Sequence, residues 1–87
     1  MKFKDKAVVI TGGGTGIGRA MCLRFAREGA AVVVNYSKSK MQADEVVSQI
    51  KEAGGRAWSI QADVTSDAEA RQLIAQAAEQ MGRFRRL

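Results

Sequence analysis

Thr11-Gly12-Gly13-Gly14-Thr15-Gly16-Ile17-Gly18 is the stretch that decides the fold of this 87-residue chain. It ends an apolar, β-branched run, Ala7 to Thr11, which is typical of a buried parallel strand. It leads into a segment, Ile17 to Glu28, that has helical character and Gly29 as a stop signal. Glycines at such a turn let the chain reverse tightly and let a phosphate approach bare backbone N–H groups. The stretch therefore predicts a strand–helix unit with an anion-binding turn.

Two further strand and helix signals follow in the same order. Apolar runs at Ala31 to Val34 and Ala57 to Ile60 predict strands. The segments from Lys40 to Ala53 and from Ser66 to Gly82 carry apolar residues at helical spacing, and glycine ends each of them. Ser66-Asp67-Ala68-Glu69 fits a capping box at the start of the last helix. The predicted order is β-α-β-α-β-α.

This order predicts an α/β fold with parallel strands and right-handed crossovers. We expect part of a Rossmann fold, a doubly wound parallel sheet in three layers that lacks its fourth strand. The expected strand order is 3-2-1, with the last helix on the face opposite the first two. The first strand would then present an unpaired apolar edge. The first helical segment has residues at helical spacings, and the second and third each carry an apolar face. These sets are Ile17, Ala20, Met21, Arg24 and Phe25; Ala43, Val46, Val47, Ile50 and Ala53; and Ala70, Leu73, Ile74, Ala77 and Met81.

Composition excludes several classes of site. Hydrophobic residues make up 46% of the chain, as in a globular protein. Cys22 is the single cysteine and histidine is absent, so internal disulfides, imidazole-based nucleophile pairs and most zinc sites are excluded, and we expect no metal site. No apolar run has the length of a membrane span or a signal-peptide core. We therefore expect a cytoplasmic location.

The net charge of +5 raises the possibility of a basic interaction protein. However, Arg83, Arg85 and Arg86 crowd the C-terminal end, and the remaining charges alternate in sign along the helices. No nucleic-acid motif accompanies them. We therefore expect no nucleic-acid partner and no membrane partner.

The glycine-rich stretch does not fit G-x-G-x-x-G in any register, but it fits T-G-x-x-x-G-I-G. This motif resembles the cofactor motif of the classical short-chain dehydrogenase/reductase family. Further landmarks at family spacing are Arg19-Ala20, Gly29-Ala30 and Ala62-Asp63-Val64-Thr65. The resemblance covers residues 5 to about 84 and is greatest to bacterial β-ketoacyl-carrier-protein reductases and glucose dehydrogenases.

The resemblance implies that residues 1–87 form the N-terminal part of a single NAD(P)-binding Rossmann domain. It assigns the pyrophosphate to the glycine-rich turn through Gly12, Thr15, Gly16, Ile17 and Gly18. It also implies that the carboxylate of Asp63 accepts a hydrogen bond from the adenine amino group, while Val64 backs the ring. The alternative is that Asp63 only forms the turn before the last helix, where Asp is common.

The residue that follows the second strand indicates which dinucleotide is bound. An acidic residue normally occupies this position in NAD-specific proteins, and family spacing places it at Tyr36. No carboxylate is present to repel a 2′-phosphate, while Ser37 and Lys38 can bind one. We therefore expect NADP, with NAD as the alternative. If Ser37 or Ser39 only caps the second helix, and Lys38 and Lys40 are solvated, this argument loses its support.

The resemblance further implies hydride transfer between NADP(H) and a carbonyl or hydroxyl substrate. Family members use a Tyr, a Lys four residues later, a Ser and an Asn, all downstream of the third helix. Tyr36 is the single tyrosine, and Tyr36 to Lys40 spells Y-x-x-x-K. We do not assign these two residues a catalytic role, because they lie at the adenosine end of the cofactor site. We expect no catalytic residue in this chain and no activity from it alone.

The family pattern is interrupted at the C-terminal end. Gly82-Arg83-Phe84 matches it, but Arg85-Arg86-Leu87 follows where a fourth strand is expected to begin with Asp. A frameshifted or split reading frame is our hypothesis, and the downstream DNA tests it. A non-catalytic nucleotide-binding module is the alternative. The helices through which the family usually forms oligomers are not part of this sequence.

Overall fold

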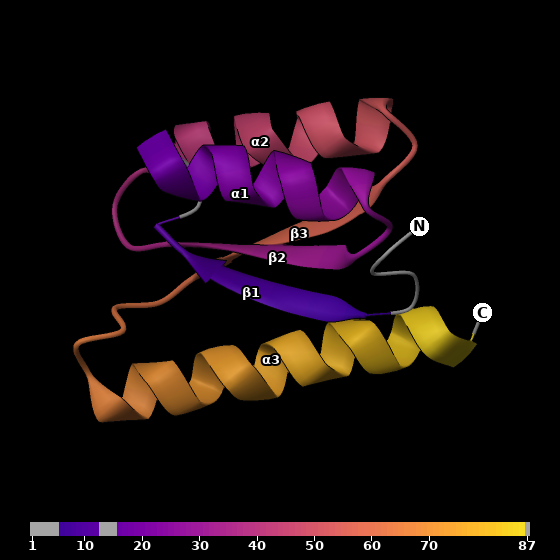
Figure 1. The fold of residues 1–87 in the computed structure, drawn as a ribbon. Helices are drawn as coiled ribbons and strands as arrows, with labels where there is room; N and C mark the ends of the chain where they lie inside the picture. The colour runs from indigo at the N-terminus through magenta and orange to yellow at the C-terminus, as the bar shows by residue number, and fades with distance from the viewer. Residues whose placement is uncertain (1–5, 13–15, 87) are drawn as a thin grey trace.

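A computed structural model describes residues 6–12 and 16–86, with side chains up to Gln80. Three strands alternate with three helices, as the sequence predicts (Figure 1). The elements are β1 (Ala7–Thr11), α1 (Gly16–Arg27), β2 (Ala31–Tyr36), α2 (Lys40–Glu52), β3 (Arg56–Gln61) and α3 (Asp67–Arg86).

The strands form one parallel sheet with β2 in the centre. Ala7 pairs with Ala31, which in turn pairs with Arg56, so the three strands begin at the same edge and run in step. Every residue of β2 is buried. The predicted order 3-2-1 is confirmed, and a fully apolar strand such as Ala31 to Val34 is explained by its central place.

Helices cover both faces of the sheet. Figure 1 shows α1 and α2 together on one face and α3 alone on the other. Alternate residues of β2 point into the two layers: Val32 and Val34 pack with α1 and α2, whereas Val33 packs with Leu73 and Ala77 of α3. The predicted three-layer, partial Rossmann fold is therefore confirmed.

Glycine ends α1 and α2 as predicted. Gly29 and Gly54 have φ values of 97° and 87°, the left-handed region that a Cβ disfavours. The N–H of Ala30 donates to the Phe25 carbonyl at 3.0 Å, and the N–H of Gly55 donates to the Ile50 carbonyl at 2.9 Å. Both helices therefore end in Schellman motifs, which turn the chain back into β2 and β3.

Several expected bounds and faces need correction. β2 continues past Val34 to Tyr36, because the strand also pairs with the end of β3. α3 does not end at Gly82 but continues to Arg86, since arginine is a good helix former and Gly82 is itself helical.

The helically spaced residues of α1 do not all lie on its buried face. Ile17 is 81% exposed and Met21 is 42% exposed, whereas Cys22 is fully buried. α1 packs against α2 as well as the sheet, and this second contact moves its buried face onto Cys22 and its neighbours. On α3, Leu73 and Ala77 are buried as expected, but Ile74 is 60% exposed.

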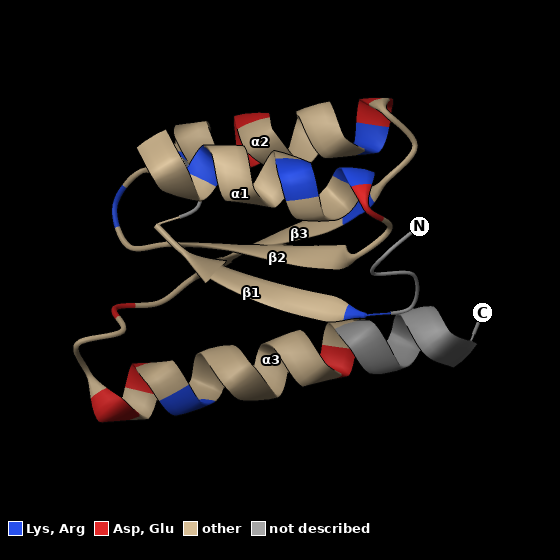
Figure 2. Ribbon diagram, in the orientation of Figure 1, with Lys and Arg blue, Asp and Glu red and all other residues tan. Residues whose placement is uncertain are grey.

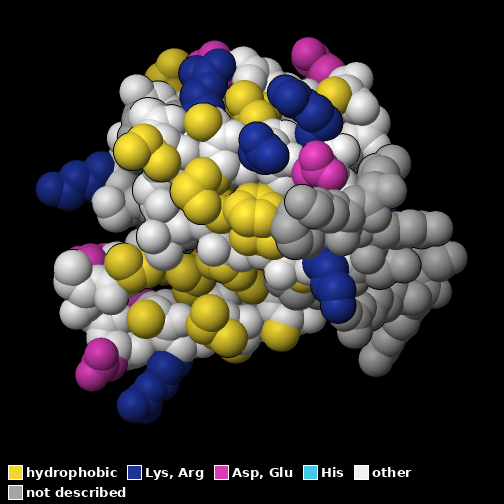
Figure 3. Space-filling view, viewed as in Figure 1, with side chains coloured by type: hydrophobic (Ala, Val, Ile, Leu, Met, Phe, Trp, Pro, Cys, Tyr) yellow, Lys and Arg dark blue, Asp and Glu magenta, His cyan; other side chains and the backbone are white. Residues whose placement is uncertain are grey.

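The face that carries the outer edge of β1 is apolar. Figure 2 shows the charged residues mainly on helices and loops. Figure 3 shows hydrophobic side chains gathered between α1 and α3, across this edge. In the part of the chain that the structure describes, β1 pairs with β2 alone, as the expected unpaired edge requires. Within the described part of the chain, no helix combines the length and apolarity needed to cross a membrane.

Candidate nucleotide-binding site

The described residues that are predicted to bind the dinucleotide lie at or just after the C-terminal ends of the strands. Because the three strands are parallel and in register, the turn after β1, the loop after β2 and the turn after β3 emerge at one edge of the sheet (Figure 1). Ligands of open α/β sheets bind at this carboxyl edge. The fold thus brings together three segments that are far apart in the sequence.

The glycine-rich turn has the backbone conformation that glycine permits. Gly12 has a φ of 63° and Gly16 a φ of 53°, and a Cβ built on either residue meets no atom of the described residues within 4 Å. These positions need glycine for conformation, and the space beside them is open. Ile17 is exposed at the start of α1, and Gly18 is half-buried. Thr15 lies outside the described residues.

The helix that follows this turn has no acidic residue in its first turn. Its N-terminal backbone N–H groups carry the positive end of the helix dipole. An anion at this end of α1 would therefore meet hydrogen-bond donors and no opposing carboxylate from the first turn.

In the loop after β2, polar side chains are exposed beside a buried tyrosine. Tyr36 is 9% exposed and its ring belongs to the core under α1 and α2. Ser37 and Lys38 are exposed, and the Gln61 side chain donates to the Ser37 carbonyl at 3.2 Å. Ser39 is the N-cap residue of α2, but its side chain makes no capping hydrogen bond. Capping by Ser39 therefore does not account for the polar residues of this loop.

The two lysines near this loop have different surroundings. Lys40 donates to Asp44 at 2.9 Å, and the hydroxyl of Ser59 donates to the same carboxylate at 2.9 Å. These hydrogen bonds lower the pKa of Asp44, and the carboxylate raises the pKa of Lys40. Among the described residues, no ion pair involves Lys38. Of the two lysines compared, Lys38 is thus the one that no ion pair with a described residue holds.

This arrangement gives a physical reason against a catalytic Tyr36–Lys40 pair. The ring of Tyr36 packs in the core, and the ammonium group of Lys40 is held by Asp44. In a catalytic pair, the phenol would have to lie beside a substrate, and the ammonium group would have to be free to lower the pKa of that phenol.

Asp63 organises the turn after β3. Its Oδ1 accepts hydrogen bonds from the Thr65 hydroxyl at 2.6 Å and the Thr65 backbone N–H at 3.0 Å. These bonds hold the pKa of Asp63 below its usual value, and the charge of Lys38 acts in the same direction. Val64 is 45% exposed beside it. Asp63 thus forms the turn while its carboxylate stays exposed and ionised.

The capping box at α3 is only half formed. The Glu69 N–H donates to the Ser66 hydroxyl at 3.4 Å, as predicted. However, the Glu69 carboxylate accepts from the Asp63 N–H at 2.9 Å, not from Ser66. The Ser66 N–H donates instead to the Asp63 carbonyl at 3.0 Å. Glu69 therefore fixes the turn that carries Asp63 in addition to the helix end.

The loops after β2 and β3 bring opposite charges to the same edge. Figure 2 shows a basic segment in the loop after β2 and an acidic segment in the turn after β3. The Ala62 N–H donates to the Tyr36 carbonyl at 2.9 Å, and the Gln61 side chain donates to the Ser37 carbonyl at 3.2 Å. These bonds join the two segments, so the predicted adenine residues and the predicted 2′-phosphate residues are neighbours.

Sequence reasoning missed Asn35. Its side chain is 2% exposed, within the otherwise apolar strand β2. The amide nitrogen donates to the carbonyls of Ile60 and Ala62, each at 3.2 Å. The sequence did contain a signal: Asn35 is a polar residue that lies between an apolar run and a predicted binding loop.

A groove lies elsewhere in the described part of the chain. It has a volume of about 690 Å³ and lies between the C-terminal ends of α1 and α2, at the edge opposite the predicted site. Its lining includes Leu23, Ala26, Ile50, Gly55 and Arg56. Among the described residues, no group of His, Cys, Asp and Glu side chains is arranged to hold a metal ion.

The fold defines the chain as a partial Rossmann protein, and comparison with known proteins defines its family. The short chain dehydrogenase family matches residues 6–87. The chain therefore belongs to the short-chain dehydrogenase/reductase family, as its motifs predict.

Relatives and solved structures agree with this assignment. An uncharacterized oxidoreductase of Methylorubrum extorquens is 49% identical over 83 residues, which are 95% of this chain and 34% of that protein. The short-chain dehydrogenase/reductase homolog YusS of Bacillus subtilis is 46% identical over 74 residues, 85% of this chain and 68% of that protein. A Burkholderia cenocepacia short chain dehydrogenase, solved in complex with NADP, superposes with a TM-score of 0.90 at 38% identity, over 94% of this chain and 34% of that one. The chain thus spans about a third of the length of most of these proteins.

Proposed function

We propose that this chain binds the adenosine half of NADP(H). The observation that carries the proposal is the position of Lys38, an exposed cation without an ion-pair partner among the described residues, at the sheet edge where the glycine turn and Asp63 also lie. A 2′-phosphate at the end of β2 would meet Ser37 and Lys38 and no carboxylate of β2 itself. The solved relative in complex with NADP supports this choice over NAD.

Each loop would hold one part of the ligand. Gly12, Gly16, Ile17 and Gly18 would receive the pyrophosphate at the α1 N-terminus, and Thr15 belongs to the same motif. The exposed Asp63 and Val64 would contact the adenine ring. The ring of Tyr36 packs in the core, so this residue would contact the ligand through its backbone. Its side chain is neutral and would not repel a 2′-phosphate.

The test compares 2′,5′-ADP, which carries the 2′-phosphate, with 5′-ADP. We expect the 87-residue chain to bind 2′,5′-ADP about tenfold more tightly, the worth of one charge-assisted hydrogen bond at a partly solvated site. Lys38→Gln should remove most of this preference. Lys51→Gln is the matched control, because Lys51 lies exposed at the other end of α2. Equal affinity for the two nucleotides in the parent chain would contradict the NADP assignment.

Hydride transfer between NADP(H) and a carbonyl or hydroxyl substrate is our proposal for the whole protein whose cofactor-binding part this sequence represents. The chain itself would be inactive, since none of its residues is assigned to the hydride step. We also propose that it is cytoplasmic and binds no nucleic acid. An assay of NADPH oxidation with the purified 87-residue chain tests the inactivity, and protein-dependent turnover would contradict it.

A non-catalytic nucleotide-binding module is the second candidate. The observation that favours it is that the YusS relative is itself short: a match of 74 residues covers 68% of that protein. Both candidates require nucleotide binding. They differ in whether a reading frame encoding the catalytic Tyr and Lys adjoins this sequence, which the neighbouring DNA decides.

A further inference from the structure

Among the described residues, the core is made of hydrophobic side chains and one buried polar side chain, that of Asn35. Its neighbours in the chain, Val34 and Tyr36, pack on the α1 and α2 side of the sheet. Asn35 therefore points toward the α3 side, where Val33, two residues earlier, packs with Leu73. Burial of an amide costs free energy unless hydrogen bonds replace its contacts with water. The hydrogen-bond partners of the Asn35 amide therefore indicate its structural role.

Those partners are the carbonyls at which β3 leaves the sheet. The last ladder bond between β2 and β3 runs from the Ala62 N–H to the Tyr36 carbonyl at 2.9 Å. The Asn35 amide donates to the Ile60 and Ala62 carbonyls at 3.2 Å each, on either side of this point. Because all these acceptors are carbonyl oxygens, the nitrogen of the amide must face them. Asn35 thus extends the pairing of β2 with β3 beyond the regular ladder.

The next residue along the chain is Asp63, so Asn35 fixes the start of the turn that carries it. Two further hydrogen bonds hold Asp63 from within the turn and from α3: the Thr65 N–H donates to its carboxylate, and its own N–H donates to Glu69. Without the amide, the Ala62 carbonyl would lose a donor supplied by β2. The turn would then keep its internal hydrogen bonds but lose a hydrogen bond to β2, the strand that ends at Tyr36.

We propose that Asn35 is a positioning residue for adenine recognition: through the Ala62 carbonyl it sets the place of Asp63 and Val64 relative to the loop after β2. This inference rests on the proposed function, because it requires Asp63 to accept from the adenine amino group. It assigns base selectivity to a side chain that has no contact with the base. It also explains an amide in a strand whose other residues are apolar apart from Tyr36.

Calorimetric titration of the 87-residue chain with ADP and with inosine diphosphate tests the proposal. Inosine diphosphate lacks the amino group that Asp63 would bind. We expect the parent chain to prefer ADP about tenfold, as one hydrogen bond to a charged group predicts. Asn35→Val, which keeps a strand-forming side chain without a donor, should bind the two nucleotides within about twofold. Asn35→Ser retains a hydroxyl donor and should keep part of the preference.

Val46→Ala is the matched control. Val46 is fully buried on α2 in the other layer, so its truncation weakens folding without contact with the turn. The control should keep the parent's preference for ADP, which separates positioning from a loss of stability. An unchanged preference in both Asn35 variants would overturn the inference and leave nucleotide binding intact. Failure of the parent chain to bind ADP would overturn the proposed function, and this inference with it.

Discussion

Gly16→Ala should separate ligand binding from folding at the glycine-rich turn. Gly16 has a φ of 53°, where a residue with a Cβ costs about 1–2 kcal/mol in the folded state. The new Cβ meets no atom within 4 Å, so no steric clash adds to this strain. Alanine also restricts the unfolded chain, which offsets about 0.4–1 kcal/mol. The expected net loss of stability is therefore roughly 1 kcal/mol.

Binding should suffer more than stability. The methyl group would stand in the open space beside the turn, where a phosphate would approach the N-terminus of α1, and we expect at least a tenfold loss of ADP affinity. Gly54→Ala is the matched control. Gly54 has a φ of 87° with no atom within 4 Å of a Cβ, but it ends α2 at the opposite edge of the sheet.

Urea unfolding and ADP titration of both variants provide the measurement. We expect similar losses of unfolding free energy in the two variants, and weakened ADP binding in Gly16→Ala alone. Equal affinities in Gly16→Ala, Gly54→Ala and the parent would show that the phosphate does not approach the glycine turn. Equal weakening in both would show that the affinity follows stability.

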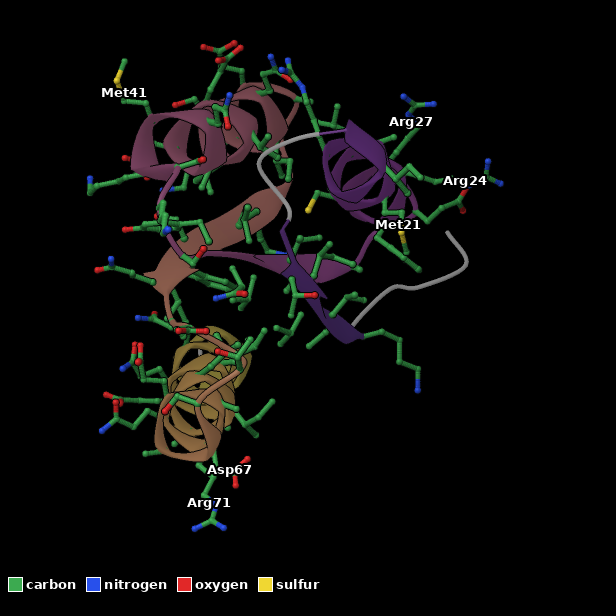
Figure 4. All side chains as sticks on the ribbon, turned by 90° about the vertical axis from the view of Figure 1, so that its left-hand side faces the viewer. Met21, Arg24, Arg27, Met41, Asp67 and Arg71 are labelled. Carbon is green, nitrogen blue, oxygen red and sulfur yellow. The ribbon has the colours of Figure 1, made fainter. Side chains whose placement is uncertain are left out.

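Three further outcomes follow from the structure. Tyr36→Asp places a carboxylate at the end of β2 and should lower the preference for 2′,5′-ADP over ADP about tenfold relative to Tyr36→Asn, the neutral control; equal preferences would contradict the NADP assignment. Burial raises the pKa of Cys22 to about 11 from 9.0, so the folded state holds this proton more tightly than the unfolded state. Thermal unfolding should therefore show stability falling between pH 9 and 11, by on the order of 2 kcal/mol more than in Cys22→Ala, and parallel pH curves would refute this. The Met21 side chain projects from α1 on the side away from α2, whereas the Met41 side chain projects from α2 on the side away from α1 (Figure 4). Because Met21 is 42% exposed on the side of the unpaired β1 edge, Met21→Lys should reduce self-association in sedimentation experiments, and Met41→Lys should not; equal effects would exclude the β1 face as its cause.

The sequence determined the number, type and order of the elements. Each strand is a short apolar run and each helix has a glycine or capping signal within a few residues, so local preferences suffice. The order 3-2-1 and the position of α3 on the opposite face followed from the expected doubly wound sheet, in which the fourth strand joins beside the first. The family followed from T-G-x-x-x-G-I-G and the landmarks after it, since their spacing is set along the chain.

Only the tertiary structure decided which side chains are available at the predicted site. Lys38 and Lys40 are equivalent by sequence, but Asp44 holds Lys40, and that carboxylate is itself fixed by Ser59 of β3. The role of Asn35 depends on carbonyls that lie 25 and 27 residues away. Which residues of α1 are buried depends on its contact with α2 as well as with the sheet, and helical periodicity carries no information about that contact. Local signals specify elements, whereas hydrogen-bond partners and burial depend on what the sheet brings together from distant parts of the chain.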